Sequence, residues 1–306
     1  MLRLLQSSQP VAWGIVPLTF AVLFVLGGVG QQGGWTMAEA PWWGGIAVLA
    51  TARWIHVVHL ESGMRTRPDA VPSWAWVLVA TPCLWWTPEM WWWGSLLVSV
   101  AMGQALRLRM GENQPGLHFW SGMAMGAIPL VSPDMWGWSA VLPLVLCAWR
   151  TPKPGEALAL ILGGLTPWWL WLGYHGWRTG DVFGGEWPAV ETGEVGTGWA
   201  FGLAPFGLVG WGLRQQSLGR ATARQRVTRK WTQWPGLAAM GAGALAWSLN
   251  PSEMAGMAWL MTGFCVAVTW SLGWCLPPKN RVTPYLPWAA WLLSAIGALM
   301  PMLTGV

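Results

Sequence analysis

The sequence predicts an all-α fold: a polytopic bundle of about eleven transmembrane helices, forming a single membrane domain over residues 1–306. Hydrophobic residues make up 54% of the chain and charged residues only 9%. So few ionisable side chains cannot solvate a globule of this size. The apolar residues also fall in runs of about 17 to 25, the length that crosses the hydrocarbon core as a helix.

The spans are bounded by short polar or proline-containing segments. The first apolar run is too long for a signal peptide and is interpreted as an uncleaved span. Short turns separate the third span from the fourth and the fifth from the sixth, whereas long loops at 176–196 and 214–231 flank the eighth. The predicted spans are Val11–Val29, Trp43–His59, Val71–Trp86, Pro88–Leu106, Gly116–Val131, Met135–Trp149, Glu156–His175, Gly198–Leu213, Pro235–Leu249, Met254–Cys275 and Tyr285–Leu303.

The basic residues predict the orientation of these spans. Lysine and arginine total 17, and alternating the spans from a cytoplasmic N-terminus leaves only Arg178 outside and Arg53 within a span. Basic loops resist translocation, so this distribution places the N-terminus in the cytoplasm and the C-terminus in the periplasm. The cytoplasmic segment Arg214–Trp231 is either a basic loop on the membrane surface or simply a topology determinant. Its basic residues include Arg220, Arg224, Arg226, Arg229 and Lys230.

Arg53, His56 and His59 lie at spacings of three residues in the second predicted span, roughly along one helical face. Charges at membrane depth are functional candidates, so one hypothesis is a site for an anionic lipid or a phosphate at the cytoplasmic boundary. The alternative is that Arg53 extends its guanidinium to the interface, with the histidines also lying there.

Three acids in short external loops, Glu39, Glu89 and Asp134, are the candidate catalytic residues. Carboxylates at the outer surface could serve as a general base toward a lipid-linked substrate. However, Thr87-Pro88-Glu89 and Ser132-Pro133-Asp134 also match a helix N-terminus, with a hydroxyl cap, proline in the first turn and an acid at the positive end of the dipole. Glu39 lacks this context. The sequence predicts no metal site and no cofactor.

Three further features concern packing. The 31 tryptophans gather at span ends, which is typical of an aromatic belt, although periplasmic clusters could also stack on sugar rings. Gly122 and Gly126 form a small-xxx-small pair that favours close helix packing. His118 and His175 are lone histidines without a partner evident in the sequence, for which structural or interfacial roles are expected.

The chain resembles an uncharacterised family of polytopic inner-membrane proteins of Bacteroidota, a domain-of-unknown-function family. The residues that carry the resemblance are Leu4–Pro10, Pro88-Glu89, Ala105–Arg109, Gly116–Leu130, Trp149-Arg150 and Gly163–Pro167. This resemblance implies a bacterial inner membrane. The order of spans is also similar to the membrane module of C-type glycosyltransferases, which implies that Glu39 is a base or metal ligand, assisted by Glu89 or Asp134. The first outside loop is shorter here than in those enzymes.

Three functions remain open. The first is a glycosyltransferase-like enzyme of cell-envelope biogenesis that acts on a lipid-linked substrate. The second is a non-catalytic membrane subunit or scaffold of an envelope complex, and the third is a transporter. The expected partners are membrane lipids, together with a lipid-linked substrate or other envelope proteins, and not nucleic acid.

Overall fold

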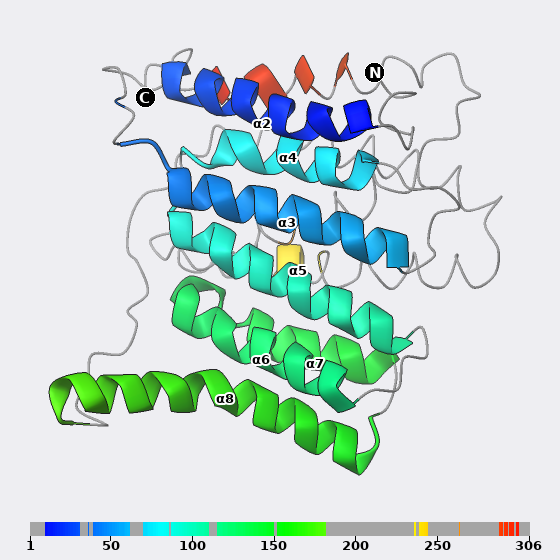
Figure 1. Ribbon diagram of the computed structural model, residues 1–306, viewed down its shortest axis with the longest axis vertical. Coiled ribbons are helices and arrows are strands. Elements are labelled where there is room, and N and C mark those ends of the chain that lie inside the picture. Colours follow the sequence, from blue (N-terminus) through cyan, green and yellow to red (C-terminus); the bar gives the residue numbers. More distant parts are fainter. Residues whose placement is uncertain are drawn as a thin grey trace. The chain divides into compact units, whose positions relative to one another are not determined.

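The computed structural model describes residues 10–30, 36, 39–61, 70–85, 87–109, 115–149 and 152–181. It also describes isolated positions at 236, 239–243, 263, 288–289, 291–292, 294–296 and 298–299. Over these residues the fold is all-α, as predicted (Figure 1). The helices are α2 (Pro10–Gly30), α3 (Trp42–Glu61), α4 (Val71–Cys83), α5 (Glu89–Arg109), α6 (Pro115–Val131), the 3₁₀ helix η1 (Pro133–Met135), α7 (Trp138–Trp149) and α8 (Pro154–Thr179).

The first seven predicted spans coincide with α2 to α8, and their ends agree within a few residues. The last four predicted spans lie almost wholly outside the described residues. Two of the described helices are long and apolar enough to cross a membrane: α2, over Trp13–Gly30, and α8. The short helix α4 is apolar but has only 13 residues. The structure therefore establishes two candidate spans among the residues that it describes.

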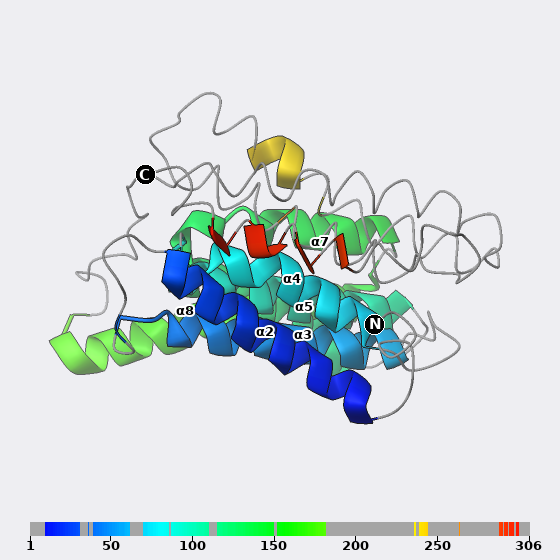
Figure 2. The ribbon, with the colours of Figure 1, turned by 90° about the horizontal axis from the view of Figure 1, so that it is seen from above.

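The chain divides into two compact units. The first contains α2, α3, α4 and the start of α5, and the second contains the rest of α5 together with α6, η1, α7 and α8. In the first unit α2, α3 and α4 run alongside one another (Figures 1 and 2). Every residue of α4 is buried, which makes it the central helix of this unit.

Hydrogen bonds from buried side chains tie α4 to its neighbours. Ser73 Oγ donates to the carbonyl oxygen of Ala52 in α3 at 2.7 Å. The indole N–H of Trp76 donates to the carbonyl oxygen of Val48 in α3 at 3.1 Å, and that of Trp74 donates to Thr19 Oγ1 in α2 at 3.2 Å. In an apolar interior these bonds fix how the helices are rotated, because a buried polar group without a partner is costly.

The second unit is organised around the contact of α6 with α8. Gly122 and Gly126 of α6 face the backbone of α8, and Gly163 of α8 faces the backbone of α6. A Cβ atom at any of these positions would fall inside van der Waals contact with a carbonyl oxygen of the other helix, so only glycine permits this approach. The predicted packing role of Gly122 and Gly126 is confirmed, and α8 is the partner helix.

Outside the glycine contact, the residues of α8 are exposed or half-buried. Only 6% of its most apolar window is buried, and its exposed side chains include Leu158, Ile161, Leu170 and Trp177. The helix ends at Gly180, whose φ of 76° is left-handed and whose backbone N–H donates to the carbonyl oxygen of Gly176.

Candidate functional site

Glu39 and Glu89, two of the three candidate catalytic acids, both lie at the N-terminal end of α3 in the first unit. Glu39 is exposed and occupies the turn that precedes α3. Its Oε2 accepts a hydrogen bond from the backbone N–H of Thr36 at 3.2 Å, three residues earlier. The carboxylate of Glu39 therefore stabilises the turn that leads into the helix.

Glu89 comes from a distant part of the chain, as the first residue of α5. Its carboxylate accepts a hydrogen bond from the backbone N–H of Gly44, in the first turn of α3. The first N–H groups of a helix have no partner within that helix, and the positive end of the helix dipole lies there. Glu89, a residue of α5, thus caps the N-terminus of α3.

Gly44 also packs closely against residues at the end of α4 and the start of α5. A Cβ atom at Gly44 would lie 2.8 Å from Leu84 Cδ2, 3.2 Å from Trp92 Cδ1 and 3.6 Å from the Cα of Glu89. Alanine at this position would require shifts of the Leu84 and Trp92 side chains, whereas the 3.6 Å distance to Glu89 is an ordinary contact. Gly44 thus packs against these side chains and also supplies the backbone N–H that Glu89 accepts.

The sequence predicts that the Thr87 hydroxyl caps α5, but in the structure this hydroxyl forms two other hydrogen bonds. Thr87 Oγ1 donates to the carbonyl oxygen of Cys83 at 2.8 Å and accepts the indole N–H of Trp92 at 3.0 Å. These bonds join the end of α4 to the first turn of α5. The acid in this motif stands in the first turn of α5, as the sequence predicted, and also accepts the Gly44 N–H of α3.

Asp134, the third candidate acid, lies in the second unit, within η1. It is 2% exposed, so its side chain is not presented at a surface. Ser132 occupies the N-cap position and Pro133 the first turn, as the sequence predicted, but the side chain of Ser132 forms no capping hydrogen bond. Among the described residues, Ser132 Oγ and the indole nitrogen of Trp138 are buried without a hydrogen-bond partner.

The three residues predicted to bind a lipid or phosphate differ in exposure. Arg53 is exposed, whereas His56 and His59 are 4% and 3% exposed. The His56 ring packs edge-on against Trp13 of α2, with centroids 3.8 Å apart. The Arg53 guanidinium lies over the same indole, with Cζ 5.7 Å from its centroid. Trp13 thus joins this group, although its position in α2 gave no sign of it in the sequence.

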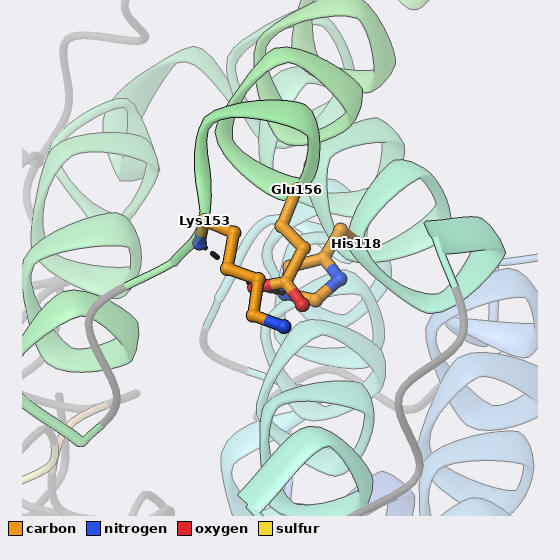
Figure 3. Close-up of polar contacts among 3 residues, drawn as sticks. All are labelled: His118, Lys153 and Glu156. Carbon is orange, nitrogen blue, oxygen red and sulfur yellow. Dashed lines mark hydrogen bonds and ion pairs between the residues drawn. The ribbon is translucent and has the colours of Figure 1, made fainter.

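Figure 3 shows a polar contact between α6 and α8 that the sequence did not reveal. Glu156 Oε2 accepts the backbone N–H of Lys153 at 2.9 Å and lies 3.7 Å from Nε2 of the buried His118. Glu156 therefore caps α8 and contacts α6 at the same time. The only indication of this cap in the sequence is that Glu156 stands three residues after Lys153, the residue that precedes α8. His175, the other lone histidine, stacks on Trp171 at 5.4 Å.

The carboxylates of Glu39 and Glu89 at the N-terminal end of α3 both accept hydrogen bonds from backbone N–H groups. Within the described ranges, no group of three or more His, Cys, Asp or Glu side chains is placed to hold a metal ion. The basic residues Arg220, Arg224, Arg226, Arg229 and Lys230 lie outside the described residues. No family model, curated protein or solved structure matches this chain.

Proposed function

We propose that this chain is a multi-pass protein of the bacterial inner membrane that acts as a non-catalytic subunit or scaffold of an envelope complex. The proposal includes about eleven spans and a cytoplasmic N-terminus, as the basic residues predict. The observation that carries it is the hydrogen bond from Gly44 N–H to Glu89, because it gives a candidate catalytic carboxylate a structural task.

The dimensions of α8 support the membrane part of this proposal. The residues between the charged Glu156 and Arg178 carry no formal charge, and their helix is about 31 Å long at 1.5 Å per residue. The hydrocarbon core of a bilayer is about 30 Å thick. Tyr174 and Trp177 are exposed near the Arg178 end, where the headgroup layer would accommodate their rings.

Two substitutions at Glu89 distinguish a role as hydrogen-bond acceptor from a role in acid–base chemistry. Glu89→Gln retains an oxygen that can accept the Gly44 N–H, but it removes the negative charge and the base. Glu89→Ala removes both. A scaffold should therefore tolerate the glutamine variant, whereas alanine should lower the free energy of unfolding by about 1 kcal/mol, as the loss of a helix cap does.

The test is complementation of a deletion strain, scored by growth in the presence of bile salts, together with purification of the chain from its native host in a mild detergent. We expect the double variant Glu39→Gln/Glu89→Gln to restore growth and to retain the proteins that co-purify with the wild type. Loss of growth with a normal amount of folded protein would contradict the scaffold proposal. Isolation of the wild type as a monomer in several mild detergents would also contradict it.

A glycosyltransferase-like enzyme is the second candidate, because Glu39 and Glu89 gather at the same end of α3 despite their separation in sequence. Two carboxylates at one outer helix end could serve a lipid-linked substrate. This candidate predicts that glutamine and alanine at Glu89 abolish function equally. The glutamine variant thus distinguishes the two functions.

A further inference from the structure

The contacts between α2 and α3 define the depth at which Arg53 would lie in a membrane. The helices run antiparallel: the ring of Trp42 lies 5.0 Å from that of Phe24, and a Cβ at Gly45 would lie 2.9 Å from Phe20 Cζ. Further along, His56 and Arg53 both meet Trp13. Arg53 is therefore level with Trp13, which lies at one end of the apolar segment Trp13–Gly30 and three residues after the start of α2.

The length of that segment relates the depth of Arg53 to the thickness of a bilayer. Its 18 residues extend about 27 Å as a helix, close to the thickness of the hydrocarbon core. Pro10, Val11 and Ala12 separate Trp13 from the polar residues Gln6, Ser7, Ser8 and Gln9, so Trp13 lies within about one helical turn of the level at which the apolar layer meets the headgroups. Arg53 belongs to this boundary, although it stands near the middle of α3.

The guanidinium of Arg53 is available to an external anion. Its side chain is exposed, and it forms no ion pair with any carboxylate of the described residues. Among the described residues its aromatic contact is with Trp13, and its guanidinium carries five N–H donors that can hydrogen-bond to an anion. His56 and His59 are turned into the packed interior and do not contribute a surface.

We infer that Arg53 and Trp13 form a binding site for the phosphate of an anionic phospholipid in the cytoplasmic leaflet. The planar fork of an arginine matches two phosphate oxygens, and an indole is at home in the headgroup layer. Anionic lipids are concentrated on the cytoplasmic side, where a basic residue attracts them. The inference rests on the membrane placement in the proposed function and adds a ligand to it.

The experiment is native mass spectrometry of the full chain in detergent, titrated with phosphatidylglycerol. We expect one bound lipid that withstands activation in the wild type, and an apparent affinity about fivefold lower in Arg53→Gln. Arg53→Lys should be intermediate, because it keeps the charge and loses the fork. The matched control is Lys153→Gln, which removes the same charge from an exposed residue and should leave the bound lipid in place.

Equal lipid affinity in Arg53→Gln and in the wild type would overturn the inference. Equal binding of phosphatidylcholine and phosphatidylglycerol would also overturn it, as would inorganic phosphate displacing the lipid at millimolar concentration, since the ligand would then not be an anionic phospholipid. Carbonate extraction of native membranes tests the proposed function separately. Release of the wild type into the supernatant would reject membrane insertion, whereas retention together with unchanged lipid binding in Arg53→Gln would reject the lipid site alone.

Discussion

Alanine at Gly163 and alanine at Gly164 should have opposite effects on stability, although the two residues are neighbours on α8. A Cβ atom at Gly163 would lie 2.9 Å from the carbonyl carbon of Phe119 and 3.1 Å from the backbone nitrogen of Met123, and closer still to the Phe119 carbonyl oxygen. A Cβ atom at Gly164 would meet its nearest neighbour, the carbonyl oxygen of Gly122, at 3.7 Å, an ordinary contact.

In all other respects the two substitutions should change the free energy of unfolding equally. Each replaces a helical glycine by alanine, which stabilises a helix by about 0.5–1 kcal/mol. At Gly163 the backbone of α6 must also retreat by roughly 1 Å to restore normal carbon contacts of about 3.5–4 Å. Overpacking of this kind costs about 1–3 kcal/mol. We therefore expect Gly163→Ala to be less stable than Gly164→Ala by about 1–3 kcal/mol, and Gly164→Ala to equal or exceed the wild type.

Reversible unfolding in mixed micelles measures this difference. The purified chain is titrated with sodium dodecyl sulfate in a mild detergent, and helix content is followed by circular dichroism. Gly173→Ala is a further control, because nothing lies within 4 Å of a Cβ at that position. Free energies of unfolding that agree within about 0.5 kcal/mol for Gly163→Ala and Gly164→Ala would refute the close approach of α6 and α8.

The same unfolding assay tests three other contacts. Glu156→Ala should lower the free energy of unfolding by about 1–2 kcal/mol and Glu156→Gln by less, because glutamine can still accept the Lys153 N–H; equal losses would contradict the cap. Ser73→Ala should cost about 1 kcal/mol through loss of the bond to Ala52, and an unchanged stability would argue against that bond. Ser132→Ala should be neutral or stabilising, since its hydroxyl is buried without a partner among the described residues; a loss of about 1 kcal/mol would instead restore the capping interpretation.

The positions of the first seven helices could be predicted because the sequence marks both their length and their ends. Apolar runs set the length, and proline with a preceding polar residue marks starts such as Glu89 and Pro154. Hydropathy does not say what an apolar run faces. Helix α4 is buried on all sides, whereas the residues of α8 are exposed or half-buried except for Gly163, yet both read as apolar spans in the sequence.

The roles of the acids could be predicted only in part, because capping can act across helices. The sequence identified Glu89 as an acid at a helix start, but the N–H group that it binds belongs to Gly44, 45 positions earlier. The pairing of His118 with Glu156 was missed for the same reason: neither residue predicts the other without the contact of α6 and α8. Trp13 likewise became relevant only through the alignment of α2 with α3.

The glycine contact between α6 and α8 and the exposed apolar side chains of α8 have a common explanation if α8 lies in lipid. Burying leucine against another helix gains little there, because the acyl chains are equally apolar. Close backbone approach then becomes the main attraction that remains, and it requires glycine at Gly122, Gly126 and Gly163. In water the same helix would expose Leu158, Leu170 and Trp177 over its full length, a surface that soluble monomers rarely carry. The glycine contact therefore supports the membrane placement independently of the hydropathy that first suggested it.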